Sequence, residues 1–578
     1  MTHDFSRDLC VKIAAALLGA ASGHGVAMGQ AEYGFRPVKI GSAGEFGQPT
    51  ISSSGLTAYT SGLGQTVWAE SPGAGGSAPI QNQLGLAGGT ILSFARPIMN
   101  TSGDVAYLAL GTMNSGGNPL TYRNDRLYRW TGTTELVAAG GLHPLPGFPL
   151  LFNQRDVLLY GFTPDPSAAG IPFAFSSAGV PTVYGRASCY NCGIVGAGLW
   201  RGVGSSLSLV IRDGQGGLMA VQPFDETMIL ATPSTNVLNT SVFYGRSSAT
   251  AHGIWQVTAT GAITSIQEGS AAPGAHGATF SELNFAPVIN NDGTIAFYAR
   301  LNNGGGGIWK GTMTSLTPVA MAGSVAPGAG GAVFNGFGDP VLNASGDTAF
   351  VGYLAGTGVD TSNDFGIWVE GPSGLVMLAR EGSAAPGTGP TGIYTSPANV
   401  ISPFNDPFMN SAGDVFFGAS WDNVEYNAGV GIWRASAADA PALVVSSEQT
   451  LEVTPGDTRR IIDVGFAFGP ASSKVGGSQA AASGGEDGRG NAVNDGGMIA
   501  FTASFDDSTG GVFVASPLTC PADLTGDGAV DGGDLLVLLA AFGPCPPAPM
   551  LCPADITGDG AVDGSDLANL LSAFGPCP

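Results

Sequence analysis

The stretch PVINNDGTIAF (Pro287–Phe297) decides the fold, because close copies of it recur along the chain. The shared core is Asn-x-x-Gly-x-x-Ala-Phe. Asparagine at the start of a turn hydrogen-bonds the backbone ahead of it, and glycine takes the positive φ that closes the turn. Residues after the glycine, such as Ile295 and Phe297, then alternate toward one face of a strand. The motif predicts a β-hairpin that serves turn formation and packing rather than chemistry.

Copies of the motif run through most of the chain. They are PVLNASGDTAF (Pro340–Phe350), PFMNSAGDVFF (Pro407–Phe417), RPIMNTSGDVAY ending at Tyr107, NDGGMIAF ending at Phe501, and the weaker TISSSGLTAY ending at Tyr59. More degenerate copies are expected near Asn153 and at Asn236, where Asn239 replaces the glycine. A repeat of this kind is the signature of a modular architecture in which each copy is one structural unit.

Each copy opens a unit that we expect to hold four short strands. Gly-Ile-Trp or a variant follows the motif, and then come a strand such as Leu316–Gly323 and a loop such as Glu268–Gly274. The Gly-Ile-Trp segments and variants are Gly253–Trp255, Gly307–Trp309, Gly366–Trp368, Gly431–Trp433 and Gly511–Phe513. Units start 54 residues apart at Asn236 and Asn290, and 53 residues apart at Asn290 and Asn343.

Four antiparallel strands, repeated many times, are typical of β-propeller blades. We therefore predict an all-β propeller of seven or eight blades over roughly residues 35–515, with the tryptophans filling the space between blades. A linear β-solenoid is the alternative, and it ranks second because its coils are shorter.

Composition and charge limit the classes of partner. The 578 residues exceed what one compact core holds, so at least two domains are expected. Glycine (92) and proline (38) are abundant without a collagen period, and apolar residues recur in short runs, which indicates a globular all-β protein. With 44 acidic against 21 basic side chains, the net charge of −23 repels phosphate backbones and anionic lipid heads. Nucleic acid is therefore not expected as a partner.

The N-terminus has the pattern of a signal peptide. Arg7 and Lys12 precede or flank the apolar stretch Ile13–Ala21, and small residues follow, with cleavage expected after Ala27 or Ala31. No later apolar run is long enough for a transmembrane segment. The mature chain is therefore expected to be secreted, either soluble or attached to the cell surface from outside.

After the last β unit the composition changes, and two near-copies of one sequence follow, CPADLTGDGAVDGGDLLVLLAAFGPC from Cys520 and CPADITGDGAVDGSDLANLLSAFGPC from Cys552. Each contains a twelve-residue loop with oxygen-bearing residues at positions 1, 3, 5, 7, 9 and 12 and glycine at position 6, the spacing of an EF-hand-like calcium loop. The candidate ligands are Asp523, Thr525, Asp527, Ala529, Asp531 and Asp534 in the first loop, and Asp555, Thr557, Asp559, Ala561, Asp563 and Asp566 in the second. The sequence predicts two bound Ca²⁺ ions.

A helix is expected after each loop, at Asp534–Phe542 and at Asp566–Phe574, because leucines there follow helical spacing. Val530 and Val562, at loop position 8, are expected to join the two loops through a small apolar contact. These features predict a small α-helical domain at the C-terminus.

Six cysteines remain after the signal peptide, an even number that suits disulfides in an oxidising compartment. They are Cys189, Cys192, Cys520, Cys545, Cys552 and Cys577. The last four allow three pairings, and we favour Cys520–Cys545 with Cys552–Cys577, each closing its own repeat at a gain of roughly 3 kcal/mol. Zinc is the rival interpretation of these four, but neither a CxxC pair nor a histidine lies near them.

The Asn-x-x-Gly-x-x-Ala-Phe repeat resembles that of exported bacterial proteins called choice-of-anchor tandem repeat proteins, which are named for this motif. The resemblance covers roughly residues 45–515. It implies a repeat region joined to one of several surface-attachment tails, and it implies no particular biochemical activity.

The C-terminal tail resembles a type I dockerin, specifically the cysteine-flanked GC-type variety. The resemblance implies that calcium folds two loop-helix repeats into a near-symmetric module whose helices bind a cohesin. In that family, loop positions 10 and 11 help to choose the partner. Here they are Gly532 and Gly533, and Gly564 and Ser565, rather than pairs of Ser and Thr. The expected partner is therefore a cohesin-like or other surface scaffold protein rather than a standard cohesin.

Catalytic motifs are not found in the sequence, which has neither HExxH nor GxSxG. Cys189 and Cys192 are expected to form a small disulfide that clips a loop. His143, His252 and His276 are scattered among different segments, and His143 and His276 are interpreted as exposed loop residues. A carboxylate pair for glycoside hydrolysis needs only proximity in space. Candidates that lie near turns are Asp339, Asp406, Asp422 and Glu425.

The predicted organisation is a signal peptide at 1–31, a propeller at 32–516 and a dockerin-like calcium-binding domain at 517–578. The favoured function is a surface-associated binding or scaffolding protein, not an enzyme, whose propeller holds a glycan or protein ligand. The alternatives are an extracellular polysaccharide-degrading hydrolase or lyase, and a purely structural cell-envelope protein. Acidic, Tyr or His side chains at the mouth of the propeller channel would favour the enzyme, whereas Gly, Ser and Ala there would favour binding.

Overall fold

The computed structural model describes residues 33–576, except 63, 72–75, 83–89, 114–121, 124–125, 140–157, 162–172, 190–192, 204–205, 214, 216–232, 248–250, 284–285, 397–401, 424–427, 455, 467–482, 518–521, 526–528, 545–553 and 558–560. The chain divides into two compact units, one of which is Phe35–Ala515 and the other of which contains Ser516–Pro578. The proposed signal peptide, Cys192 and the four C-terminal cysteines lie outside the described residues. None of the helices in the described part is long and apolar enough to cross a bilayer.

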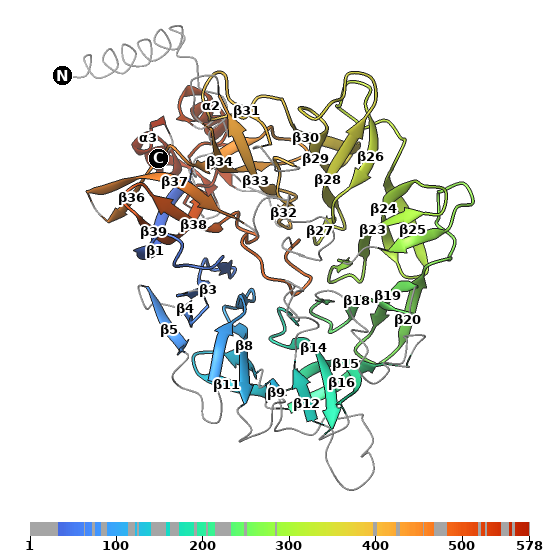
Figure 1. Cartoon of the computed structure of the whole chain (residues 1–578). Helices are drawn as coiled ribbons and strands as arrows, with labels where there is room; N and C mark the ends of the chain where they lie inside the picture. The colour runs from blue at the N-terminus through green and yellow to red at the C-terminus, as the bar shows by residue number, and fades with distance from the viewer. Residues whose placement is uncertain are drawn as a thin grey trace, which may run out of the picture. The chain divides into compact units, whose positions relative to one another are not determined.

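The first unit is an eight-bladed β-propeller, and Figure 1 shows its sheets arranged in a ring. Blade 1 holds β2 (Thr50–Ile51), β3 (Thr57–Ser61), β4 (Thr66–Glu70) and β5 (Ser77–Asn82). Blade 2 holds β6 (Thr90–Phe94), β7 (Ile98–Met99), β8 (Val105–Met113), β9 (Tyr122–Arg123), β10 (Arg126–Trp130) and β11 (Thr134–Ala139). Blade 3 holds β12 (Leu158–Gly161), β13 (Phe173–Phe175), β14 (Pro181–Cys189), β15 (Gly193–Val203) and β16 (Ser206–Arg212). Blade 4 holds β17 (Ser234–Thr235), β18 (Ser241–Arg246), β19 (His252–Val257) and β20 (Ile263–Gln267).

The second half of the ring repeats this pattern with clearer copies of the motif. Blade 5 holds β21 (Phe280–Leu283), β22 (Val288–Ile289), β23 (Ile295–Leu301), β24 (Gly306–Thr312) and β25 (Ser315–Met321). Blade 6 holds β26 (Val333–Phe337), β27 (Val341–Leu342), β28 (Thr348–Ala355), β29 (Phe365–Gly371) and β30 (Gly374–Arg380). Blade 7 holds β31 (Ile393–Tyr394), β32 (Phe408–Met409), β33 (Val415–Asp422), β34 (Ala428–Ala435) and β35 (Ala442–Ser446). The prediction of an all-β propeller is confirmed, with eight blades.

Blade 8 combines strands from both ends of the unit. It holds β36 (Thr450–Thr454), β37 (Asp457–Gly465), β38 (Ile499–Phe505), β39 (Thr509–Pro517) and the N-terminal β1 (Tyr33–Ser42). The strand order is β1-β39-β38-β37-β36, so the first strand of the chain pairs with the last strand of the propeller. This pairing closes the ring.

The motif forms the same turn in every blade. In blade 5, Asn290 N donates to Thr294 O and Gly293 N donates back to Asn290 O, and the Asn290 Oδ1 accepts from Thr294 N at 3.0 Å. The residues at the Asn290 position in the other blades are Ser52, Asn100, Ser176, Asn236, Asn343, Asn410 and Asn494. Asn239 has a φ of 60°, as expected for the residue that replaces the turn glycine. The predicted turn is confirmed.

Blade 3 differs from the sequence-based expectation. The copy expected near Asn153 lies outside the described residues, and the turn of this blade is formed by Ser176–Gly179 instead. Serine occupies the asparagine position there, and its hydroxyl donates to Val180 O at 3.4 Å. The search for asparagine missed this copy because serine can also start such a turn.

The motif asparagine also links neighbouring blades, which the sequence reading did not anticipate. Asn236 Nδ2 donates to Asn290 O at 2.9 Å, and Asn290 Nδ2 donates to Asn343 O at 3.1 Å. Asn494 Nδ2 of blade 8 donates to Ser52 O of blade 1 at 2.9 Å, across the closure of the ring. The Oδ1 atom of the motif asparagine thus stabilises its own turn, and the Nδ2 atom of the same side chain binds the next blade.

We expect Asn290→Ala to lower the free energy of unfolding by about 1 kcal/mol more than Asn343→Ala does. Both substitutions remove the same turn contact, but only Asn290 donates to the next blade, whereas Asn343 Nδ2 has no acceptor among the described residues. Urea unfolding followed by tryptophan fluorescence measures the difference. Equal losses for the two variants would show that the link between blades contributes nothing.

Aromatic side chains fill the space between blades, as predicted. The tryptophans that are completely buried are Trp200, Trp255, Trp309, Trp368 and Trp433. Trp309 lies opposite the motif residue Phe297 with stacked rings 6.4 Å apart, and its Nε1 donates to Pro273 O in the loop that precedes the blade. Gly307 precedes this tryptophan because a Cβ there would lie 2.6 Å from Ala320 O and 3.1 Å from the indole. The Gly-Ile-Trp segment is therefore a packing motif.

A basic residue after the buried aromatic makes a second recurring contact between blades. In each case the cation donates to the carbonyl of the turn glycine, or its replacement, in the next blade. The pairs are Arg129 with Gly179, Arg201 with Asn239, and Lys310 with Gly346. Sequence reasoning missed this signal, although the basic residue directly follows the aromatic position in these blades.

The second unit is small and two-fold repeated. It holds β40 (Ala529–Val530), α2 (Gly532–Ala540), β41 (Gly543–Pro544), β42 (Ala561–Val562), α3 (Gly564–Ser572) and β43 (Gly575–Pro576). The two expected helices are present and begin two residues earlier than predicted. Val530 and Val562 lie in one core, together with Leu538 and Leu570. The strand pairing, however, joins β40 to β43 and β41 to β42, so each loop pairs with the segment after the opposite helix.

Candidate functional site

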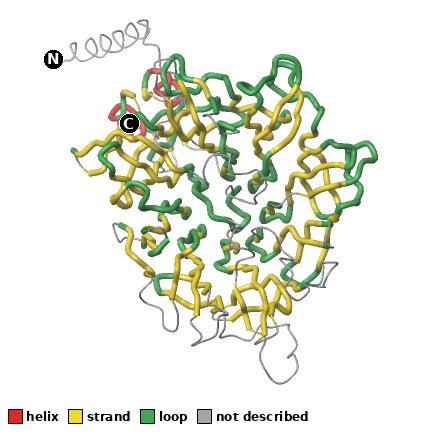
Figure 2. Tube along the Cα trace, viewed as in Figure 1, coloured by secondary structure: helices red, strands yellow, loops and turns green. Residues whose placement is uncertain are grey.

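A segment of blade 8, Ser483–Asn494, crosses the middle of the propeller, and we name it the strap. In Figure 1 it is the orange trace inside the ring, and Figure 2 shows it as loop surrounded by strands. Its backbone carbonyls accept hydrogen bonds from the inner strands of four blades. The donor and acceptor pairs are Ile51 N with Asn491 O (2.9 Å), Phe175 N with Gly488 O (2.6 Å), Thr235 N with Asp487 O (2.7 Å) and Met409 N with Ser483 O (3.2 Å). The strap carbonyls thus bind backbone amides of the inner strands that would otherwise face the channel without a hydrogen bond.

Side chains fix the strap from blade 5 and from within. Glu486 accepts from Asn291 N at 2.8 Å and from Asn291 Nδ2 at 2.7 Å. Arg489 Nη2 donates to Pro287 O at 2.7 Å. Asp487 accepts from Ser483 Oγ at 2.7 Å and from Arg489 N at 3.1 Å.

Asp487 and Arg489 are both buried, with exposed fractions of 1% and 6%. Burial raises the pKa of Asp487 and lowers the pKa of Arg489, and the opposite charge of each partner counteracts the shift. The charge of each residue thus stabilises the charged form of the other. The pair stabilises the strap only while both residues are present.

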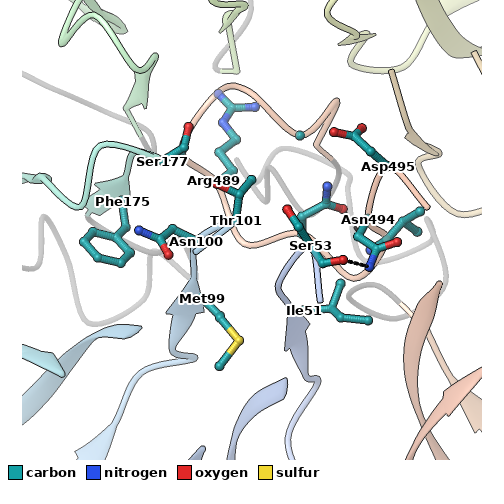
Figure 3. A pocket seen from close by; sticks show the side chains of 14 residues that line it. Ile51, Ser53, Met99, Asn100, Thr101, Phe175, Ser177, Arg489, Asn494 and Asp495 are labelled. Carbon is teal, nitrogen blue, oxygen red and sulfur yellow. Dashed lines mark hydrogen bonds between the residues drawn. The ribbon is translucent and has the colours of Figure 1, made fainter. Parts of the chain in front are cut away.

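A shallow pocket opens beside the strap, and we name it the turn-tip pocket (Figure 3). Its polar side chains come from the tips of the motif turns and from the strap. They are Ser53, Asn100, Thr101, Ser177, Arg489, Asn491, Asn494 and Asp495. Hydroxyl, amide and glycine groups dominate this lining. They share the lining with Ile51, Met99, Phe175 and Val493.

The candidate carboxylates do not form a catalytic pair. Asp339 and Asp406 occupy equivalent positions in blades 6 and 7, each before the proline that precedes an inner strand. Asp406 Oδ1 lies 3.6 Å from the place that a Cβ on Gly338 would take, so its carboxyl group lies near the backbone that precedes Asp339. Asp406 is only 5% exposed, and neither residue lines the turn-tip pocket. Asp422 is the exposed last residue of β33, and Glu425 lies outside the described residues.

The histidines also lie apart from one another. His252 begins β19, where its Nδ1 lies 3.1 Å from Glu268 Oε1 and its ring stacks on Tyr244. His276 is exposed in a loop with a φ of 52°, and His143 lies outside the described residues. The described residues thus bring no histidine into the turn-tip pocket.

A buried pair of carboxyl groups joins the ends of one hairpin in blade 6. Glu381 is 2% exposed, and its Oε1 accepts from Ser396 N at 3.1 Å and from Ser396 Oγ at 2.7 Å. Its other oxygen and Asp364 Oδ1 are buried without a donor among the described residues. Burial, together with the neighbouring Asp364 carboxyl, raises the pKa of Glu381 to about 7 against the lowering effect of Ser396. One proton shared by the pair removes the repulsion between the two groups.

The two tail loops repeat the same contacts. Asp534 Oδ1 accepts from Thr525 N at 2.8 Å and from Thr525 Oγ1 at 3.0 Å, and its Oδ2 accepts from Asp531 N at 2.8 Å. Asp531 caps α2 by accepting from Gly533 N at 2.6 Å. The second loop places Asp566, Thr557, Asp563 and Ser565 in the same way.

The carboxylates at loop position 12 are held ionised. Burial tends to raise the pKa of Asp534, but hydrogen bonds from the Asp531 and Thr525 amides outweigh it and hold the pKa below its ordinary value. Hydrogen bonds from Asp563 and Thr557 likewise lower the pKa of Asp566. An ionised carboxylate is what a calcium site requires.

The donor set of each loop consists of hard oxygen atoms, which suits Ca²⁺. Thr525 Oγ1 lies 3.4 Å from Asp523 Oδ1 and 3.0 Å from Asp534 Oδ1, so three candidate ligand atoms from positions 1, 3 and 12 converge. The described residues form no group of three or more Asp, Glu, His or Cys side chains placed to hold a metal. The position-5 residues, Asp527 and Asp559, lie outside the described part of the chain.

Comparison with known proteins identifies a family without a known activity. The model of a family of unknown function (DUF7453) matches residues 188–525, which is more than half of the chain. No curated protein is significantly similar to this chain.

Several solved structures are similar to this chain at low identity. The Dos1 propeller has 9% identity and a TM-score of 0.38, over 83% of this chain and 95% of that chain. Virginiamycin B lyase from Staphylococcus aureus has 12% identity and a TM-score of 0.30, over 71% of this chain and 97% of that one. A puromycin-hydrolyzing peptidase of Mycobacterium tuberculosis has 12% identity and a TM-score of 0.31, over 83% and 60%. At these values the likenesses assign no activity.

Proposed function

The chain belongs to that family of unknown function, and we propose from its own residues that it is an exported, surface-attached binding protein. In this proposal the propeller holds a ligand, and residues 517–578 form a dockerin-like calcium module that attaches the protein to a cohesin-like or other surface scaffold. The repeat region and tail together are those of the choice-of-anchor tandem repeat proteins that the sequence resembles.

The observation that carries the proposal is the duplicated loop-helix unit with matching oxygen contacts in both copies. A loop built around an aspartate at position 12, repeated in tandem, supports the binding of two Ca²⁺ ions by the residues named for the two loops. The ions would neutralise the clustered carboxylates and couple metal binding to folding of the module. Secretion fits this assignment, because extracellular calcium is abundant enough to fill sites of modest affinity.

The helices of the module and the residues directly after them supply a surface for a partner. Their exposed apolar side chains are Leu536 (69%), Val537 (40%), Leu539 (49%), Phe542 (52%), Leu571 (51%) and Phe574 (47%). Leu539 and Phe542 recur as Leu571 and Phe574 at the same positions of the second copy. Exposed apolar groups gathered on a small module mark a protein-binding surface. The turn-tip pocket, with its small polar lining, supports a binding role for the propeller.

Calcium binding to the mature full-length chain tests the metal assignment. Calorimetric titration of chelator-treated protein with CaCl₂ is expected to give two sites in the wild type. The double variant Asp523→Asn, Asp555→Asn is expected to lose affinity about tenfold or more, because each loop loses a carboxylate ligand. Asp292→Asn, at an exposed turn of the propeller, is the matched control and should bind as the wild type does. Absence of binding in the wild type would refute the calcium assignment.

Capture from the native extracellular and envelope fraction tests attachment. The wild-type chain is expected to retain a defined surface protein in calcium and to release it in chelator. The double variant should retain none, whereas Asp292→Asn should retain as much as the wild type. Calcium binding without any capture would show that the module is a stabilising cap and not an attachment device.

A further inference from the structure

The turn-tip pocket is built by one position of the repeat in four successive blades. The residue that follows the motif asparagine, or the serine in its place, is Asp495 in blade 8, Ser53 in blade 1, Thr101 in blade 2 and Ser177 in blade 3. Figure 3 shows these residues around the opening, with Arg489 of the strap beside them. The pocket therefore presents side chains that the turn itself does not need, because the turn contacts are made by the preceding residue and the glycine.

Apolar side chains form the floor of the pocket, and their few exposed atoms share its open surface with the polar walls. Ile51, Met99, Phe175 and Val493 have exposed fractions of only 1–3%. A ligand that enters the pocket therefore meets hydroxyl, amide and charged groups at the walls. A small open surface divided between polar and apolar atoms does not suit a lipid, whose binding depends on extensive apolar contact, whereas a sugar ring presents both kinds of surface.

Two buried donors at the pocket have no acceptor among the described residues. Asn100 Nδ2 is one of them; the equivalent nitrogen of Asn343, outside the pocket, also has no acceptor among the described residues, whereas those of Asn236, Asn290 and Asn494 each donate to the next blade. Arg489 Nε is the other, and both side chains are more than nine-tenths buried. A buried donor left unpaired is unfavourable, and a ligand with acceptor oxygens would recover that loss.

The charges around the pocket indicate an uncharged ligand. Arg489 and Asp495 contribute one charge of each sign, and Asp495 Oδ1 accepts from Ser411 N at 2.9 Å. The chain as a whole carries a net charge of −23, which repels anions over longer distances. A compact molecule that carries many hydroxyl groups and no charge fits this combination of donors and acceptors.

Building on the proposed binding role of the propeller, we propose that the turn-tip pocket binds one uncharged sugar residue. Its hydroxyl groups exchange hydrogen bonds with Thr101 and Ser177 and accept from Asn100 and Arg489. Asp495 and Ser53 bound the site on the opposite side (Figure 3). The attached remainder of a glycan would extend away from the face that carries the turn tips.

Saturation-transfer NMR with the mature full-length chain tests this site. The probes are glucose, galactose, mannose and N-acetylglucosamine, with glucuronate as the charged comparison. Thr101→Trp and Ser177→Trp fill the pocket from two blades. Ala344→Trp is the matched control, because Ala344 occupies the same turn position in blade 6 and does not line the pocket. Thermal unfolding of each variant confirms that the propeller remains folded.

We expect at least one neutral sugar to bind the wild type, and both pocket variants to lose affinity about tenfold or more because the indole occupies the ligand's space. Ala344→Trp should bind as the wild type does. The proposal is overturned if no neutral sugar binds, if glucuronate alone binds, or if Ala344→Trp loses as much affinity as the pocket variants. None of these results depends on the tail, so they separate this proposal from the attachment proposal.

Discussion

Replacing Asp487 with alanine is expected to lower the free energy of unfolding by about 3–5 kcal/mol. The carboxylate is 1% exposed, and its loss leaves the buried Ser483 hydroxyl and the Arg489 amide without their acceptor. It also removes the negative charge that supports the buried Arg489 guanidinium. Removing one of two buried opposite charges costs more than the two contribute together, because only Asp339 then opposes the burial of the Arg489 guanidinium.

Urea unfolding followed by tryptophan fluorescence measures this loss. Asp487→Asn is the matched variant, because the amide keeps an acceptor oxygen for Ser483 and Arg489 and removes only the charge. It should lose clearly less stability than Asp487→Ala. If Asp487→Ala costs under about 1 kcal/mol, the strap is not an integral part of the propeller core.

The stability of the propeller is expected to fall as the pH rises from about 4.5 to about 7, and Glu381 is the cause. Burial beside Asp364 raises its pKa from 4.5 to about 7. In this window the folded chain keeps a proton that the unfolded chain has released, so the unfolded state binds fewer protons and stability decreases with pH. The contribution is at most about 3 kcal/mol, fully present below pH 4.5 and lost above pH 7.

Glu381→Gln should remove this dependence, because the neutral amide can donate to Asp364 at every pH while its oxygen still accepts from Ser396. Unfolding in urea at pH 5 and at pH 8 gives the comparison. The wild type should lose more stability between the two pH values than the variant does. Asp292→Asn, which removes an exposed carboxyl group at a turn of blade 5, is the control. An unchanged pH slope in Glu381→Gln would contradict the shared proton.

The repeat in the sequence determined the propeller because every element of it is local. Asn290 and Gly293 make their turn within five residues, and the tryptophan that packs the blade follows at a fixed distance. The tail helices were predictable for the same reason, since Asp531 and Asp534 cap the helix that follows them directly. Local patterns fix local structure, and repetition then specifies the architecture.

The strap could not be predicted, because nothing in its own sequence marks it as buried. Residues 483–494 are rich in glycine and polar side chains, which is the usual composition of an exposed loop. Its partners, such as Thr235 and Asn291, lie about two hundred residues or more away in the chain. Only the closed ring brings them together.

The equivalent positions of two candidate carboxylates could be predicted from the aligned repeats. Asp339 and Asp406 stand at one position of the motif, directly before the proline, and this places them in neighbouring blades at the same depth. The turn-tip pocket was missed, because the residue after the motif asparagine varies freely when each copy is read separately.

The pairing of β1 with β39 has a mechanical consequence. The tail follows β39 directly in the chain, so a force applied to a tethered tail enters the propeller along this strand. β39 lies between β38 and β1, and hydrogen bonds between strands run across the strand direction. Pulling along β39 therefore shears both rows of bonds at once instead of opening them one by one. In a protein held at its C-terminus in flowing liquid, the force would thus act on β39, the strand best placed to resist it.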